Sequence, residues 1–543
     1  MAESNISFKT KLRYRFDNIM ARGPIALIGW LGLLSLLLVC AAAILLTVSG
    51  FTQDDGETMG FIEAAWKSLM RTLDPGTMGG DTGWGFRITM LGVTLGGIFI
   101  VSTLIGVLAS GISNKLDELR KGHSFVVEKD HTLILGWSEK IFPIISELLI
   151  ANENQKNPVI VILGEKDKVE MEDELKSKIP DTKNTRVICR SGSTVDLNDI
   201  EIVNPHESRS IIILAHEGND PDISVIKTIL ALTNNPGRRQ EPYHIVAEIS
   251  DHKNKEVAEM IASGEVTLVH TEDLISRVIA QSCRQSGLSV VYTELLDFDG
   301  DEIYFQEEPG LNGKTFKEAV MSYDDSAVMG IRGKDGKTII NPPMDTVFNP
   351  GDKVVAISKD DDTIRLSSGG AASVNPDAIT TGSPKMADTE KTLILGWNCK
   401  ACNIAMELDN YLAPGSMLTV VAEGEGVEEQ LNDLKPRLKN QVVEFKPGNI
   451  SDRELLDSME LHIYNHIILL SYSDTMPEQD ADSKSLITLL HLRNIEEKTG
   501  NDFTIVSEMM DIRNKELAEV TEADDFIISN KLISLMLSQL SEN

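Results

Sequence analysis

The sequence predicts a membrane α-helical domain with two spans, followed by cytoplasmic α/β domains in tandem, with doubly wound parallel sheets and one small α+β lobe. Two observations predict this fold class. Two long apolar runs lie near the N-terminus, at residues 25–48 and 86–112. Behind them, one pattern of short β-branched runs and helical stretches occurs twice at a constant displacement.

Composition limits the class of protein before any motif is considered. The 543 residues suffice for three or more domains. Lys and Arg number 51 against 83 Asp and Glu, a net charge of −32, which argues against nucleic acid as a partner. The five cysteines are too scattered for a disulfide framework, so we expect the soluble part in a reducing cytosol.

The first apolar run, residues 25–48, contains no charged side chain. As a helix it would span about 36 Å, enough for a bilayer core of about 30 Å, whereas a secretory signal has a shorter apolar region. Residues 1–24 before it are basic, and Lys115, Arg120 and Lys121 follow the second run. This charge bias predicts that both termini and all later domains are cytoplasmic, in a bacterial-type inner or plasma membrane.

The stretch between the two runs, residues 61–80, has the pattern of a re-entrant pore loop. Phe61, Ala65 and Leu69 recur every four residues, so residues 61–72 can form a half-helix with one packed face. Non-helical backbone at membrane depth is tolerated only where protein or a water-filled cavity satisfies it, as in a pore.

Five residues after this half-helix would then form the selectivity filter: Leu73, Asp74, Pro75, Gly76 and Thr77. If four chains meet on an axis, Asp74 forms a ring of carboxylates that favours cations, helped by the negative C-terminal ends of the half-helices. The alternative is that Asp74-Pro75-Gly76 forms an ordinary exposed turn.

The second apolar run, residues 86–112, is rich in small residues, and we expect both apolar runs to contact membrane lipid. Its glycine pair, Gly96 and Gly97, admits two interpretations. The pair can be a hinge for an inner gate, or it can let two helices pack closely.

The remainder of the chain contains an internal repeat. HTLILGW at residues 131–137 recurs as KTLILGW at 391–397, and VAEISDHKNKEVAE at 246–259 recurs as VSEMMDIRNKELAE at 506–519. Both pairs are displaced equally, since 391 − 131 = 506 − 246 = 260. One domain type is therefore used twice.

Each copy contains strand candidates, which are short apolar runs between longer helical patterns. In the first copy they are Thr132–Leu135, Val159–Leu163, Arg186–Cys189, Ser210–Leu214 and His244–Ile249. In the second they are Thr392–Leu395, Met417–Ala422, Gln441–Phe445, His466–Leu470 and Phe503–Glu508. Such runs bounded by helices predict a Rossmann-like parallel sheet covered on both faces.

Changes in composition give the domain boundaries. We expect a transmembrane domain at 25–112, a linker at 113–128, the first α/β domain at 129–290, a turn-rich α+β lobe at 291–366, a linker at 367–389 and the second α/β domain at 390–543.

A dinucleotide-binding fold carries G-x-G-x-x-G at its first βα turn. Only the first glycine is present here, because the three positions are Gly136, Ser138 and Ile141 in the first copy and Gly396, Asn398 and Ala401 in the second. We therefore expect no NAD.

Cys399 and Cys402 form a C-x-x-C at the same turn of the second copy, where a helix N-terminus can lower a thiol pKa. The first copy has Glu139 and Phe142 at these positions, and two cysteines do not complete a zinc site. Their role stays open.

Carboxylates close the fifth strand of both copies: Glu248 and Asp251 in the first, Glu508 and Asp511 in the second. Carboxylates at a strand end suit Ca²⁺. N-capping of the following helix is the preferred interpretation of the two aspartates, and ligation remains open for Glu248.

These residues together resemble ion channels with RCK domains (regulators of K⁺ conductance), and more closely a bacterial-type member of the Castor and Pollux family. The resemblance rests on EAAWKSL, LILGWSEK, VAEISDHKN, HTEDLISRVIAQSCRQSGL and INPPMDTVFNPGDKVVAISKDDDT, and it covers about residues 61–363 well.

The resemblance implies a homotetrameric, ligand-gated cation channel, in which the RCK domains form a gating ring that senses Ca²⁺ or another cytosolic ligand, with Glu248 as the Ca²⁺ ligand. No T-V-G-Y-G occurs, so K⁺, Na⁺ and Ca²⁺ all remain candidate permeant ions. Two other classes stay open: a membrane-anchored regulatory subunit of a K⁺ transporter, and a nucleotide-dependent oxidoreductase. The missing glycines disfavour an enzyme.

Overall fold

The computed structural model describes residues 24–51, 59–120, 122–216, 220–262, 264–367, 375–378, 388–500, 503–521 and 523–542. The basic segment before residue 24 and most of the linker expected at 367–389 lie outside these ranges. The chain divides into two compact units, residues 1–121 and 122–543.

In the described residues of the first unit, three helices pack together: α2 (Pro24–Ser49), α3 (Phe61–Leu73) and α4 (Trp84–Arg120), with the 3₁₀ helix η1 (Pro75–Gly80) after α3. Their shared core includes Ala43, Leu46, Ala64, Phe86 and Met90. Ala26–Ser49 and Trp84–Ser113 are long and apolar enough to cross a membrane, by length and composition.

The two glycines of α4 lie at close helix contacts. A Cβ on Gly97 would lie 2.7 Å from the carbonyl oxygen of Thr72, and one on Gly96 would lie 2.6 Å from a methyl group of Leu38. Close packing therefore explains both residues, and the hinge role stays a prediction. The helix runs unbroken to Arg120, so the first part of the expected linker at 113–128 is helical.

The second unit contains two parallel six-stranded sheets with the same strand order, β3-β2-β1-β4-β5-β6 and β13-β12-β11-β14-β15-β16. The first sheet consists of β1 (His131–Leu135), β2 (Val159–Gly164), β3 (Arg186–Ser191), β4 (Ser208–Ile213), β5 (Ile245–Ile249) and β6 (Val266–His270). The second consists of β11 (Lys391–Leu395), β12 (Ser416–Ala422), β13 (Gln441–Pro447), β14 (His466–Leu469), β15 (Thr504–Met509) and β16 (Asp525–Ile528).

Helices alternate with these strands in both copies. The first copy has α5 (Ile141–Ala151), α6 (Lys168–Lys178), α7 (Leu197–Ile202), α8 (Pro221–Thr233), α9 (His252–Ala262) and α10 (Thr271–Arg284). The second has α13 (Ala401–Asp409), α14 (Val427–Leu434), α15 (Arg453–Asp457), α16 (Glu478–Thr499), α17 (Ile512–Ala518) and α18 (Ser529–Glu542). The predicted doubly wound fold is confirmed.

Sequence analysis missed the sixth strand of each sheet. Both strands are short, and β6 ends at His270 where α10 begins at Thr271, just as β16 ends at Ile528 where α18 begins at Ser529. Without Gly, Pro or Asn between strand and helix, no local signal separates the two elements.

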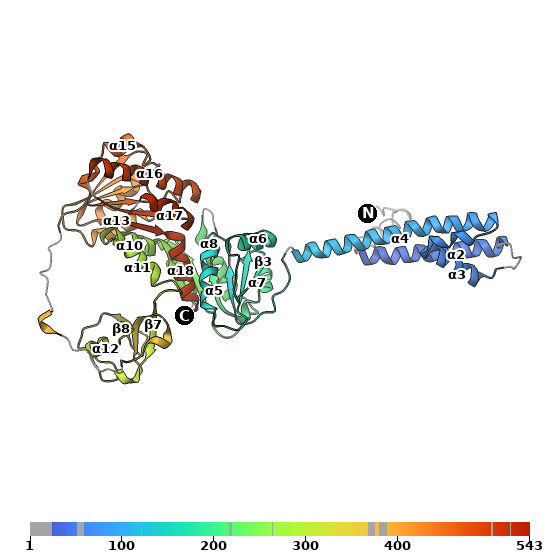
Figure 1. The fold of residues 1–543 in the computed structure, drawn as a ribbon, viewed down its shortest axis with the longest axis horizontal. Helices are drawn as coiled ribbons and strands as arrows, with labels where there is room; N and C mark the ends of the chain where they lie inside the picture. The colour runs from blue at the N-terminus through green and yellow to red at the C-terminus, as the bar shows by residue number, and fades with distance from the viewer. Residues whose placement is uncertain are drawn as a thin grey trace, which may run out of the picture. The chain divides into compact units, whose positions relative to one another are not determined.

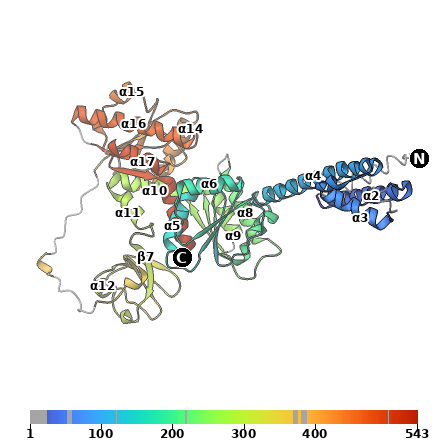
Figure 2. The same ribbon diagram turned by 45° about the vertical axis from the view of Figure 1, so that its right-hand side comes forward.

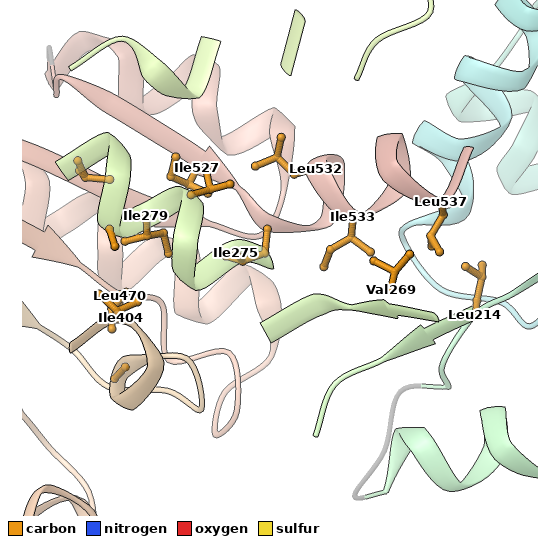
Figure 3. Close-up of a cluster of buried hydrophobic side chains, with 14 of the residues drawn as sticks. Leu214, Val269, Ile275, Ile279, Ile404, Leu470, Ile527, Leu532, Ile533 and Leu537 are labelled. Carbon is orange, nitrogen blue, oxygen red and sulfur yellow. The ribbon is translucent and has the colours of Figure 1, made fainter. Parts of the chain in front are cut away.

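The last helix of each copy packs on the other copy. Helix α10 follows β6 but contacts α13 and the strands β14, β15 and β16, while α18 follows β16 and contacts α5, β4, β5 and β6 (Figures 1 and 2). Figure 3 shows the result: Ile279 of α10 lies near Ile527 and Leu470 of the second copy, and Leu537 of α18 lies near Leu214 of the first. The two copies therefore share one hydrophobic core.

A small lobe follows α11 (Leu288–Glu294). It contains an antiparallel sheet in the order β7-β10-β8-β9 and a short helix, α12 (Phe316–Val320). The strands are β7 (Glu302–Glu307), β8 (Ala327–Arg332), β9 (Thr338–Ile340) and β10 (Lys353–Ser358). Phe316, Phe348 and Val354 are buried in its core. The residues from 291 to 294 are helical, so the β part begins later than expected.

Candidate functional site

The predicted filter residues lie in a tight loop at the C-terminal end of α3. Leu73 ends the helix, Asp74 is extended, and Pro75, Gly76 and Thr77 begin η1. Asp74 Oδ1 accepts a hydrogen bond from the Gly76 N–H at 2.8 Å, and its carbonyl accepts one from Thr77 Oγ1 at 3.0 Å. All five residues are exposed in the chain, so the carboxylate of Asp74, which caps the start of η1, lies on the surface of the loop.

A buried ion pair joins the two ends of this loop, with one partner before it and the other after it. Arg71 Nη2, in the last turn of α3, donates to Asp81 Oδ1 at 2.5 Å, and only 4% of Arg71 and 9% of Asp81 is exposed. Arg87 of α4 also donates from Nε to the Asp81 carbonyl at 2.8 Å. Sequence analysis missed this pair, although opposite charges bracketing a loop between apolar runs were a signal for it.

Glu248, the predicted Ca²⁺ ligand, is buried at the end of β5. Its Oε2 accepts from Lys140 Nζ at 2.7 Å, and its Oε1 accepts from the Ala215 N–H at 2.6 Å. Both carboxylate oxygens therefore face positively polarised groups.

Glu508 repeats this arrangement in the second copy. Its Oε1 lies 3.2 Å from Lys400 Nζ and accepts from Ser529 Oγ at 2.6 Å, while its Oε2 accepts from Asn398 Nδ2 at 2.8 Å. Burial alone would lower the pKa of Lys400, but the charge of Glu508 outweighs it, so the pKa of Lys400 is raised and its ammonium stays protonated. The two pairs match in sequence, since 508 − 248 = 400 − 140 = 260.

Asp251 and Asp511 lie at helix starts. Asp251 Oδ1 accepts from the Lys253 N–H and Asp511 Oδ1 from the Arg513 N–H, both at 2.9 Å. Burial would raise the pKa of Asp511, but its hydrogen bonds with Arg513 outweigh this and lower it. The structure therefore places both aspartates as helix caps.

A second pair of aspartates, missed in the sequence, holds these turns. Asp222 accepts from the backbone N–H groups of Ser250 and Asp251, each at 2.9 Å. Asp482 accepts in the same way from Met510 at 2.9 Å and from Asp511 at 3.0 Å. These aspartates bind the turns because α8 packs beside β5, and α16 packs beside β15 in the second copy. This contact joins residues far apart in the sequence, so no local pattern predicts it.

Ammonium and N–H donors surround Glu248, where Ca²⁺ would need several oxygen ligands. Among the residues that the structure describes, no group of three or more His, Cys, Asp or Glu side chains is arranged to hold a metal ion. The arrangement as it stands does not fit the cation, and the Ca²⁺ role of Glu248, Asp251, Glu508 and Asp511 stays a prediction.

The first βα turns are shaped by packing. Gly136 has φ +114° and Gly396 has φ +91°, and a Cβ on them would lie 2.7 Å and 2.3 Å from the carbonyl oxygens of Leu214 and Leu470. These glycines are required by the neighbouring strand. In the second copy, Trp397 is buried after the turn and donates to Gln430 Oε1 at 3.0 Å.

The C-x-x-C has the electrostatics of an unreactive thiol. Desolvation of the thiol and the nearby carboxylates of Asp474 and Glu272 raise the pKa of Cys399, although part of the residue is exposed. Burial also raises the pKa of Cys402. A redox role needs the opposite shift.

Comparison with known proteins identifies the family. Residues 272–373 match the family model described as "Castor and Pollux, part of voltage-gated ion channel". The chain is 30% identical to the probable ion channel POLLUX of Arabidopsis thaliana, over 100% of this chain and 69% of the relative. It is 32% identical to the ion channel CASTOR of Lotus japonicus, over 99% of this chain and 66% of the relative.

Other relatives are longer, since the chain spans 64% of the probable ion channel CASTOR and 59% of the probable ion channel POLLUX of Oryza sativa subsp. japonica. Among solved structures, the human SLO3 gating ring matches with a TM-score of 0.53 and 15% identity, over 76% of this chain and 82% of that one. This match shows the fold of the tandem copies, which are RCK-like. The chain belongs to the Castor and Pollux family.

Proposed function

We propose that this chain is the pore-forming subunit of a ligand-gated cation channel, a homotetramer whose RCK-like copies form a cytoplasmic gating ring. The observation that carries the proposal is the joining, in one chain, of two helices of membrane-spanning length around the half-helix α3 to two RCK-like copies. The names of the relatives support it, because they are called ion channels or probable ion channels.

The pore of this channel would be lined at its narrow part by the loop after α3. Asp74 is exposed in the chain, so four copies around an axis can present four carboxylates to a permeating ion. The C-terminal end of α3 adds partial negative charge at the same place. Cations would be favoured over anions, with K⁺, Na⁺ and Ca²⁺ as candidates.

Matched apolar faces support assembly of a ring. On α8 and α9 of the first copy, Leu230, Val257 and Met260 are 36%, 47% and 84% exposed. The residues displaced by 260, on and beside α16 and α17 of the second copy, are in the same order Leu490, Leu517 and Val520, which are 48%, 60% and 73% exposed. Exposed apolar side chains at matched positions of both copies suit an association surface, because burying them against another subunit is favourable.

The gating ligand in this proposal is Ca²⁺ or another cytosolic ligand that binds the ring and acts on α4 through the segment up to residue 128. The shared core of the two copies favours such coupling, because α10 and α18 tie movement in one copy to the other.

Single-channel recording of the purified full chain in a planar bilayer tests the proposal. We expect discrete conductance that changes when cytosolic Ca²⁺ is stepped under K⁺/Na⁺ and then K⁺/Ca²⁺ bi-ionic conditions. Silence under all conditions, from protein shown to be tetrameric, would favour a regulatory subunit of a separate K⁺ transporter. Conductance that does not respond to Ca²⁺ would support the assignment of the chain as a channel and would exclude Ca²⁺ as its gating ligand.

A further inference from the structure

The loop that carries Asp74 is fixed at both ends by buried contacts. At its start, α4 approaches the end of α3 so closely that a Cβ on Gly97 would meet the backbone of Thr72. At its end, Asp81 is bonded to Arg71 of α3 and through its carbonyl to Arg87 of α4. The seven residues between, 74–80, are exposed in the chain.

The burial of Arg71 and Asp81 makes their pairing necessary. Each is more than nine-tenths buried, between apolar helices, where an unpaired charge costs far more than in water. If one partner loses its charge, the other must move toward water, and the end of the loop must move with it. The pair therefore sets the distance between the two loop ends.

We propose that Arg71 and Asp81 are positioning residues for ion selectivity, which act by fixing the loop that holds Asp74. The inference rests on the proposed channel function. Selectivity in a ring of carboxylates depends on the spacing of its oxygens, and that spacing follows the position of the loop. Neither residue needs to touch the permeating ion.

The experiment is bi-ionic recording of the purified full chain with Arg71→Gln, Asp81→Asn, the exchanged pair Arg71→Asp/Asp81→Arg, and Arg71→Lys. Glu63→Gln is the matched control, because Glu63 is exposed on the same helix. Chromatography and cross-linking report whether each variant assembles like the wild type.

We expect each single charge-removing variant to change the ratio of permeabilities for K⁺ and Na⁺ by at least about threefold. The exchanged pair should return the ratio toward the wild-type value, and Arg71→Lys should stay close to it. A role limited to stability would lower the amount of assembled protein and leave the ratio unchanged.

Three outcomes decide the matter. Assembled single variants with the wild-type ratio would overturn the inference and leave the channel proposal intact. If the single variants assemble poorly, recording from the few channels that do form decides: a changed ratio in them supports the inference, and a wild-type ratio overturns it. Absence of current from the wild type would contradict the proposed function itself, and the inference with it.

Discussion

The two RCK-like copies hold the same buried ion pair in different surroundings. In the second copy, Glu508 accepts hydrogen bonds from the side chains of Asn398 and Ser529 as well as facing Lys400. In the first, Glu248 has Lys140 and one backbone N–H. The side chain of Lys140 is 19% exposed and that of Lys400 is 10% exposed.

One substitution between the copies explains much of this difference. Ser138 stands where the second copy has Asn398, and within the described part of the chain its buried hydroxyl has no hydrogen-bond partner. A serine is too short to reach the glutamate as the asparagine does. The glutamate of the second pair therefore accepts more hydrogen bonds than the glutamate of the first. The two copies keep the same pair of charges but differ in the uncharged groups that surround it.

The largest expected effect is on the free energy of unfolding, when the lysine of each buried pair is replaced. Lys400→Met leaves Glu508 buried without its only charged partner in the described part of the chain and should destabilise the chain by about 3–5 kcal/mol. Lys140→Met should cost less, about 2 kcal/mol, because its site is more open to water. Thermal unfolding of the full chain measures both, with Lys498→Met on the exposed side of α16 as control. Equal losses would contradict the comparison.

The next effect depends on pH and belongs to the first copy. Burial raises the pKa of Glu147 on α5 from an ordinary value of 4.5 to about 7, with Asp297 nearby, although the Phe298 N–H donates to it at 3.1 Å. The folded chain then binds more protons than the unfolded chain between these two values. The contribution of Glu147 to stability is therefore fully present below pH 4.5 and is lost, by about 3 kcal/mol, as the pH rises through about 7.

Glu147→Gln should remove this pH dependence from the melting temperature. Glu407 occupies the matching position in the second copy, since 407 − 147 = 260, and it binds Tyr411 and Arg277 instead. Glu407→Gln is therefore the control. A melting temperature whose pH dependence is unchanged in Glu147→Gln would contradict this account.

The smallest expected effect concerns the two caps. Asp251→Ala and Asp511→Ala should each cost about 1 kcal/mol, as the loss of an N-cap does, with the larger loss at Asp511 because it also pairs with Arg513. Melting curves with and without Ca²⁺ measure this cost. If either variant abolished a Ca²⁺-induced shift in melting temperature, the aspartate would be a ligand as well as a cap.

The fold was predictable from sequence where its signals are local. The repeat of HTLILGW fixed the register of the two copies, and continuous β-branched runs marked five strands in each. The sixth strands and the exchange of α10 and α18 were not predictable, because no turn residue separates β6 from α10 and nothing local says which sheet a helix covers.

The candidate site was predictable in part. The residues of the loop and the capping aspartates follow from spacing and helix-start chemistry, and the structure gives the caps their partners. The partners of Glu248 and Asp81 were not predictable, because Lys140 lies 108 positions from Glu248 and the pairing of Arg71 with Asp81 depends on how η1 folds back. Long-range contacts decide whether a carboxylate is free to bind a cation.

The most direct test of the central claim is the reversal potential of the purified channel before and after Asp74→Asn, under bi-ionic conditions. The account predicts that the wild type prefers cations over anions and that the variant loses a large part of this preference, because the carboxylate ring carries the charge. Unchanged selectivity, conductance and block in an assembled variant would contradict the assignment of residues 73–77 as the filter.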